Sequence, residues 1–286
     1  MRRLAGVFYG ATLKRRDLAD FTCSENTYSP NLRLASHGHE RSYFSLVLAG
    51  SYTERYGRKT RDCDRLSASF HPPEEMHSDC FCNTGGRLFS VEFKPALIDR
   101  IADLGIRLCD PGEFKGGLPI QLGFRLYREF QKEDVPSQLS LEGAALELLA
   151  EISRLEFRDS VAPAAWLKRA EEILRSSFSS PPGLFELASA VEVHPVHLAR
   201  EFRGHFGCTV GEYIRQLRVD FACQALFQTD AALIEIALNA GFSDQSHFTR
   251  TFRSAMGVPP AQFRKLRRQK SGSIPLRVFK TSQAPS

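Results

Sequence analysis

The sequence predicts an α+β chain of two domains: a β-barrel with trailing helices, then an all-α domain that holds two helix-turn-helix units. Three observations support this. Short strand-like runs dominate residues 1–95, a 3.6-residue apolar period appears over 96–158, and short helical segments follow from Trp166 onward. A length of 286 residues, with 42% apolar and 25% charged residues, suits two globular domains.

The changes in pattern also place the domain boundaries. We expect the first domain over residues 1–158 and a linker, charged and then small, over 159–165. The second domain follows over 166–270. The weakly patterned residues 271–286 are expected to form a mobile tail.

The composition excludes several classes of protein. The sequence holds no run of 18 apolar residues, so we expect no transmembrane helix and no membrane partner. The basic start lacks the apolar stretch and cleavage site of a signal peptide. The seven cysteines are scattered and form no pair of C-x-x-C knuckles. A disulfide framework or zinc ribbon is therefore not supported, and the pattern predicts a reduced, cytoplasmic protein.

Four short runs carry the strand prediction for the first domain. They end at Gly or Pro residues and cover 43–48, 51–56, 66–70 and 88–93. Strands at this spacing are typical of a β-barrel or a double-sheet roll. Gly85-Gly86 and Gly116-Gly117 are interpreted as turns.

Two helices are expected after the strands, over residues 122–130 and 139–157. The second carries an apolar stripe with two interpretations: it packs on the barrel, or it forms a dimer surface. The stripe consists of Leu141, Ala145, Leu148, Leu149, Ile152 and Leu155.

The charge is unevenly distributed along the chain. Of the net +5, residues 160–286 contribute +6 and residues 1–159 contribute −1. A basic module attached to a neutral one is typical of nucleic-acid-binding proteins, although the excess is modest.

Residues 184–207 predict two short helices joined by a tight turn. Pro195 suits the first position of the second helix, because the N–H that it lacks is not needed there. Leu198, Phe202 and Phe206 recur at the spacing of a buried stripe. The face opposite this stripe is expected to carry Val196, Ala199, Arg200 and Arg203.

Residues 233–257 predict the same arrangement again. Gly241 supplies the turn, Asp244 is expected to cap the second helix, and Phe248 and Phe252 form its buried stripe. The other face is expected to carry side chains that suit base edges and phosphates in a major groove: Gln245, Ser246, Thr249, Arg250 and Arg253.

A long amphipathic helix is expected between the two units, over residues 210–228. Thr209 and Glu212 form a capping box at its start. The 18 steps between these 19 residues span roughly 27 Å. Such a strut suits two reading helices that enter successive major grooves, about 34 Å apart.

These segments together resemble the AraC-type (arabinose-regulator-like) transcription factors. The resemblance covers about 100 residues: LFELA at 184–188, HLAREFRGHFG at 197–207, YIRQLRVDFACQAL at 213–226, and above all IALNAGFSDQSHFTRTFRSAMGVPPAQFR at 236–264. It implies base contacts by Val196, Ala199 and Arg200 in the first unit, and by Gln245, Ser246, Thr249 and Arg250 in the second. His194 and Ala232 depart from the pattern, because the family usually has a Ser helix cap at both positions; a lost cap costs about 1 kcal/mol.

The strand-rich start looks like the cupin-like regulatory barrel that often precedes this block. The resemblance rests on His37-Gly38-His39, the strand that ends at Gly50, and residues 72–77. In metal-binding cupins an H-x-H pair, a Glu and a later His hold a metal ion; here Tyr43 and Phe44 occupy the region of that Glu. Three interpretations stay open for His37, His39 and His77: contact with an organic effector, metal binding, or no binding role.

We take the three histidines as candidate effector contacts, and we assign no metal and no cofactor. A barrel of this size can hold one small ligand, unless aromatic side chains fill it, in which case the effector is another protein. The aromatic side chains in question are Phe44, Tyr52, Phe70 and Phe89.

The sequence therefore predicts a transcription regulator that is not an enzyme. Its expected partners are double-stranded DNA, RNA polymerase, an unknown small-molecule effector and a second copy of the chain as a homodimer. Activation is what the resemblance most often implies. The alternative is a metal-dependent cupin enzyme domain fused to a DNA-binding module, which requires a metal ion on His37, His39 and His77.

Overall fold

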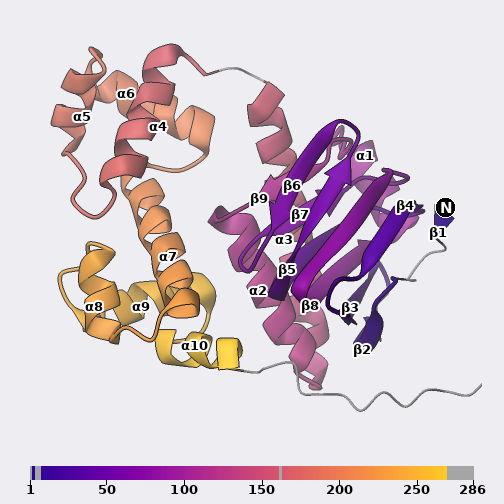
Figure 1. Cartoon of the computed structure of the whole chain (residues 1–286). Coiled ribbons are helices and arrows are strands. Elements are labelled where there is room, and N and C mark those ends of the chain that lie inside the picture. The colour runs from indigo at the N-terminus through magenta and orange to yellow at the C-terminus, as the bar shows by residue number, and fades with distance from the viewer. Residues whose placement is uncertain (1, 4–7, 161–162, 269–286) are drawn as a thin grey trace, which may run out of the picture.

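The computed structural model describes residues 2–3, 8–160 and 163–268, and the expected tail at 271–286 lies outside these residues. A strand-rich part and a helical part lie side by side (Figure 1). The strands are β1 (Arg2–Arg3), β2 (Ala11–Asp17), β3 (Phe21–Tyr28), β4 (Arg33–His39), β5 (Tyr43–Tyr56), β6 (Lys59–Cys63), β7 (Ala68–His71), β8 (His77–Phe93) and β9 (Gly112–Phe114).

The helices fall into two groups along the chain. The first group follows the strands: α1 (Pro95–Asp103), α2 (Gly117–Gln131) and α3 (Val135–Ser160). The second group is α4 (Ala165–Ser177), α5 (Leu184–Ala190), α6 (Pro195–Phe206), α7 (Val210–Gln228), α8 (Leu233–Asn239), α9 (Gln245–Met256) and α10 (Pro260–Arg268). Within the described residues, none of these helices has the length and apolarity that crossing a membrane requires.

Two long strands, β5 and β8, organise the sheet. β8 pairs antiparallel with β3, β4 and β5, and β5 pairs in turn with β6 and β7. The prediction that a strand ends at Gly50 and that Gly85-Gly86 form a turn was wrong. Both sites are irregularities inside continuous strands, with φ of 75° at Gly50 and 65° at Gly85. A Cβ at Gly50 would collide with the carbonyl of Gly85, so glycine is needed for this close approach.

The helices α1, α2 and α3 cover one face of the sheet (Figure 1). Phe44, Phe70 and Phe89 are fully buried and belong to the cluster that these helices complete. Tyr52 instead lines a cavity among β4, β5, β7 and β8, and we call this strand-rich part of the fold the barrel. Three of the four aromatic residues therefore pack outside that cavity.

The apolar stripe of α3 packs on the rest of the first domain. Leu141, Ala145, Leu148, Leu149 and Ile152 are at most 1% exposed, and Leu155 is partly buried against the same cluster. Of the two interpretations, the structure supports packing, and the stripe offers no dimer surface. The outer face of α3 exposes Leu139 and Leu146 instead.

The helices α4 to α10 divide between two apolar clusters. The first half of α7 closes a cluster with α4, α5 and α6, built on Leu174, Leu198 and Phe202. The second half of α7 packs with α8, α9 and α10, and this cluster is continuous with that of the barrel and α2. The two helix-turn-helix units are therefore held differently, because the second one shares a core with the first domain.

Candidate functional site

The helix α6 presents the face that the sequence predicts. Pro195 is its first residue, Leu198 and Phe202 are fully buried, and the side chain of His194 accepts a hydrogen bond from the N–H of Val196 at 3.3 Å. His194 therefore supplies a cap in place of the usual serine. On the outer face Val196 is 69% exposed, Arg200 and Arg203 are exposed, and Ala199 is half-buried.

Arg200 already lies beside its neighbours on the same helix. Its Nε donates to Glu201 Oε1 at 3.0 Å, and its Nη2 lies 3.1 Å from His197 Nδ1. Such an exposed ion pair is worth little, so a phosphate or guanine can displace it at small cost.

The helix α9 repeats this arrangement with more polar groups. Asp244 caps it by accepting the N–H of His247 at 2.7 Å, and this bond lowers the pKa of the Asp244 carboxyl. Phe248 and Phe252 are fully buried. The outward face consists of Gln245, Ser246, Arg250 and Arg253, all exposed, with Thr249 half-buried.

The helix α7 joins the two units. Thr209 and Glu212 form the predicted capping box, and the 19 residues of the helix span about 28 Å. Arg218 is engaged within the protein, because its guanidinium donates to the carbonyls of Phe178 and Ser179 at 3.0 and 3.3 Å. Arg215 is exposed and lines, with Arg250, a groove of about 370 Å³ between α7 and α9.

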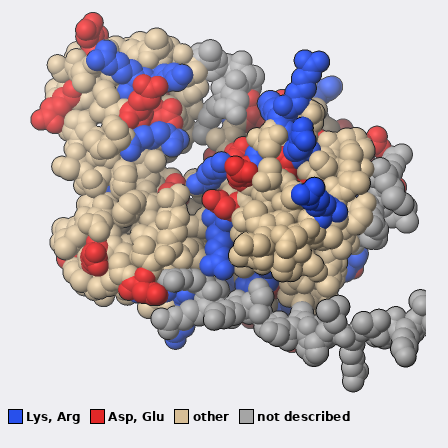
Figure 2. All heavy atoms as spheres, viewed as in Figure 1, with Lys and Arg blue, Asp and Glu red and all other residues tan. Residues whose placement is uncertain are grey.

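Figure 2 shows one face of the molecule. Lys and Arg side chains gather over the α4–α6 region and along its boundary with the barrel, where acidic groups accompany them. The visible face of the α8–α9 region is mostly uncharged. Further Lys and Arg side chains stand on the barrel in this view, so the positive charge is not confined to the helical domain.

The barrel brings the three predicted histidines together. His37 and His39 come from β4 and His77 from β8, and each is at most 4% exposed. One ring nitrogen of each lies within 4.8 Å of the others. Because a carbonyl only accepts, Nδ1 of His37 donates to the carbonyl of Ala35 at 2.9 Å, and Nδ1 of His77 donates to that of Glu75 at 3.1 Å.

These bonds leave Nε2 of His37 and His77 with a lone pair. In the structure the Tyr43 hydroxyl donates to His77 Nε2 at 3.2 Å. Proteins commonly orient histidines that bind metals through Nε2 by a hydrogen bond from Nδ1 to a backbone carbonyl. The three imidazoles therefore fit a divalent transition-metal ion such as zinc or iron.

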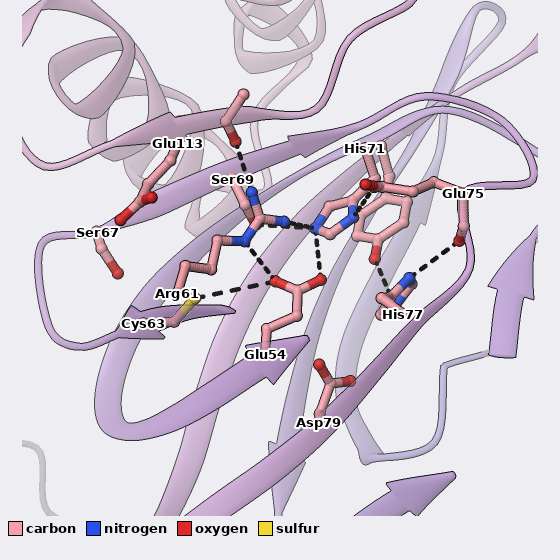
Figure 3. Close-up of polar contacts among 12 residues, drawn as sticks. Glu54, Arg61, Cys63, Ser67, Ser69, His71, Glu75, His77, Asp79 and Glu113 are labelled. Carbon is pink, nitrogen blue, oxygen red and sulfur yellow. Dashed lines mark hydrogen bonds and ion pairs between the residues drawn. The ribbon is translucent and has the colours of Figure 1, made fainter. Parts of the chain in front are cut away.

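A second polar cluster beside the histidines was missed in the sequence (Figure 3). Glu54 Oε2 accepts from Arg61 Nε at 2.7 Å, and Arg61 Nη2 donates to His71 Nε2 at 2.9 Å. His71 Nδ1 then donates to Glu75 Oε2 at 2.8 Å. His71 is therefore neutral, and burial holds its pKa well below the usual range.

The alternation of inward-facing and outward-facing residues along β5 could have placed Glu54 in the cavity. The irregularity at Gly50 shifts this alternation by one residue. Tyr43 and Ser45 line the cavity at odd positions before Gly50, whereas Tyr52 and Glu54 line it at even positions after it. A regular period-2 pattern carried through Gly50 assigns Glu54 to the wrong face.

The cavity inside the barrel is small. The histidines, Tyr43 and Asp79 leave a free volume of about 30 Å³, which is room for an ion or for one or two waters. Burial raises the pKa of Asp79 well above its ordinary value. In this conformation the barrel does not hold an organic ligand of ordinary size, since such pockets measure roughly 300–1,000 Å³.

The match to a protein-family model lies in the last third of the chain. The family model described as "Helix-turn-helix domain" matches residues 187–266. The "Probable transcription factor PqrA" of Proteus vulgaris is 44% identical over 69 residues, which cover 24% of this chain and 57% of the relative. The "Bifunctional transcriptional activator/DNA repair enzyme AdaA" of Bacillus subtilis is 31% identical over 108 residues, which cover 38% and 51%. The chain thus spans about half the length of these curated relatives.

A solved structure matches a similar share of the chain. It is a transcriptional regulator from Chromobacterium violaceum whose title names AraC-type DNA-binding domain-containing proteins. The identity is 30%, the match covers 36% of this chain and 93% of that chain, and the TM-score is 0.35. Residues 187–266 therefore match a helix-turn-helix domain, and this part of the chain is similar to the domain that AraC-type regulators carry.

Proposed function

We propose that the protein is a transcription regulator that binds double-stranded DNA at specific sequences. The observation that carries this proposal is the pair of helices, α6 and α9. Their apolar stripes are buried, apart from the partly buried Phe206 of α6, while their other faces carry exposed cations. Each follows a short helix and a tight turn, which is the geometry of a recognition helix in the major groove.

The two helices contact the bases through different kinds of side chain. In α6 the exposed Val196 and the half-buried Ala199 suit contact with thymine methyl groups, and Arg200 suits a guanine. In α9 the contacts fall to Gln245, Ser246, Thr249 and Arg250, while Arg203 and Arg253 suit phosphates. The Thr249 hydroxyl donates to the carbonyl of Gln245 at 2.7 Å, so this side chain offers its methyl group and a lone pair.

The test is quantitative binding of the full chain to its operator, first mapped by footprinting. Arg250→Ala is expected to cost about 1–3 kcal/mol and to relax the preference at one base pair. Arg58→Ala is the matched control, because Arg58 is also an exposed arginine and lies at the β5–β6 turn. An unchanged footprint and affinity for Arg250→Ala contradicts the assignment of Arg250 as a base contact.

The first domain is proposed to control the second. We assign residues 1–158 to an effector-binding domain and 166–270 to the DNA-binding domain, joined by 159–165. RNA polymerase contact and activation are proposed on the resemblance to the family. A homodimer requires a surface other than the buried stripe of α3.

A second candidate function concerns the barrel, and the three converging imidazoles favour it. His37, His39 and His77 would hold a transition-metal ion, which supplies Lewis-acid or redox chemistry when bound. The domain is then a metal-dependent enzyme fused to a DNA-binding module. Metal analysis of the purified chain separates the functions: one equivalent of metal that His39→Ala removes supports this candidate, and no metal after incubation with zinc or ferrous iron excludes it.

A further inference from the structure

The helix α2 lies between the barrel and the second helix-turn-helix unit (Figure 1). It is buried on most sides, with Phe124, Leu126 and Phe130 at most 5% exposed. One side packs on α3 and the sheet, and the other contacts the helical domain. The ring of Phe124 lies 5.2 Å from that of Phe263 in α10. A change in packing at this contact therefore alters the surroundings of both domains.

A cavity of about 280 Å³ opens at this contact, outside the barrel. Among the described residues, its walls combine aromatic and aliphatic side chains with one cation and side-chain amides. They include Phe124, Arg128 and Gln131 of α2 with Met256, Val258 and Phe263 of the helical domain. The volume is about ten times that inside the barrel and close to the range of small-molecule sites. Interfaces between domains are a preferred place for such sites.

Arg128 is the cation of this cavity, and its present bonds are long. Its Nη1 donates to the carbonyl of Met256 at 3.4 Å, and its Nε and Nη2 each lie 3.4 Å from Glu129 Oε1. Lys132 binds the same Glu129 carboxylate more closely, at 2.9 and 3.0 Å. The guanidinium therefore retains the capacity to bind a carboxylate through two parallel hydrogen bonds.

The hydrogen bond from Arg128 joins α2 to α9, the DNA-reading helix of the second unit. Met256 is the last residue of α9, and Gly257 ends that helix with φ of 71°. A Cβ at Gly257 would collide with Arg128 Nη1, so the glycine also admits the guanidinium. A ligand that binds Arg128 in place of the Met256 carbonyl breaks the hydrogen bond that joins α2 to the end of α9.

We propose that this cavity, between α2 and the α9–α10 corner, binds a small organic anion with an apolar body, and that Arg128 binds its carboxylate. Phe124, Val258 and Phe263 contact the apolar body. The binding event stands on the cavity alone. Its regulatory consequence rests on the proposed function, in which the ligand alters the hold of α2 on α9 and thereby the affinity for DNA.

The test is calorimetric binding to the full chain in the absence of DNA. The probes are 2-naphthoate, 4-phenylbutyrate and decanoate, each paired with the corresponding neutral alcohol. At least one acid is expected to bind, and its alcohol is expected to bind about tenfold more weakly. Absence of binding by all three acids, or equal binding of acid and alcohol, overturns the proposal.

Variants then locate the site. Arg128→Gln is expected to weaken acid binding about tenfold. Arg125→Gln is the matched control, because Arg125 lies on the same helix, pairs with Glu147 at 3.0 Å and does not line the cavity. Val258→Phe narrows the cavity, leaves Arg128 in place and is expected to abolish binding. Circular dichroism checks that each variant folds. If Arg128→Gln does not fold, Val258→Phe alone decides the location of the site.

Equal acid binding by wild type, Arg128→Gln and Val258→Phe overturns the location. Because no DNA is present, this failure leaves the DNA-binding proposal intact. Conversely, loss of the operator footprint leaves acid binding untouched. If both proposals hold, the bound acid changes the operator affinity of the wild type and of Arg125→Gln but not that of Arg128→Gln.

Discussion

Asp220 shows how a single residue couples the two domains. It lies on α7, and its carboxylate accepts the N–H of Gly117, at the start of α2, at 3.1 Å. Gln216 donates to it at 2.9 Å, and Gln216 in turn accepts from Gln121 of α2 at 2.7 Å. Burial raises the pKa of Asp220 to about 7, and these hydrogen bonds offset that effect only in part. The packed interface therefore disfavours the ionised carboxylate.

We expect Asp220→Asn to stabilise the protein more at pH 8 than at pH 5. A carboxyl with a folded-state pKa of about 7 and an unfolded value of 3.8 binds more protons when folded. Its contribution to stability is full below the unfolded pKa and is lost as the pH rises through 7. One pKa unit is worth about 1.4 kcal/mol, and two units separate pH 5 from the folded pKa, so the gain at pH 8 should exceed that at pH 5 by up to about 2.7 kcal/mol.

The measurement is chemical denaturation of both proteins at the two pH values. Asp230→Asn is the matched control, because Asp230 is an exposed carboxylate just beyond the end of α7. A pH-independent effect of Asp220→Asn, or an equal effect of Asp230→Asn, contradicts the prediction.

At the scale of the element, the ends of the helices decide local stability. The capping box at Thr209 and the cap at Asp244 form as the residue types indicate. His194 also caps α6, which the family pattern did not imply, because its Nδ1 can accept where a serine oxygen usually does. Ala232 leaves the start of α8 without a side-chain cap. Of the two departures from the family pattern, Ala232 therefore weakens α8, whereas His194 does not weaken α6.

Ala232→Ser is expected to raise the free energy of unfolding by about 0.5–1 kcal/mol. The backbone at Ala232 is extended, with φ of −60° and ψ of 147°, so a serine oxygen there can accept an orphan N–H of α8. Urea denaturation measures the gain. Ala232→Val adds bulk without an acceptor, and an equal gain from that variant would show that capping is not the cause.

At the scale of the whole molecule, α7 sets the separation of the reading helices. It is tied to the first unit by the Tyr213 hydroxyl, which donates to Glu171 at 2.6 Å, and by Arg218. It is tied to the second unit through Val219 and Leu226, which are buried in the cluster that holds α8, α9 and α10. With both ends packed, the separation of α6 and α9 is not freely adjustable.

We therefore expect binding to depend sharply on operator spacing. Inserting 5 base pairs between the two half-elements turns the second one to the opposite face of the duplex. The affinity should fall at least about 100-fold, because one reading helix then loses its base contacts. Gel-shift titration measures this, with the same 5 base pairs inserted outside the half-elements as the control. Equal affinity for both DNA fragments contradicts a rigid strut.

The helical domain was largely predictable from the sequence, because its signals are local. Glycine at a positive φ, capping side chains and a 3.6-residue apolar period each act within a few residues, and they predicted α5 to α9 closely. The outward faces of α6 and α9 followed directly, since an aromatic stripe that is buried leaves the opposite residues in solvent. The histidine cluster followed from family resemblance, and the structure brings its three members together.

The tertiary structure alone decided the contacts between distant segments. The irregularity opposite Gly85 shifts the faces of β5, so the place of Glu54 beside Arg61 and His71 depends on how two strands pair. The stripe of α3 had two possible partners, and only packing shows that the first domain covers it. The cavity at Arg128 joins residues about 130 positions apart along the chain. Local sequence patterns report what a segment must bury, whereas the identity of the covering surface depends on long-range packing.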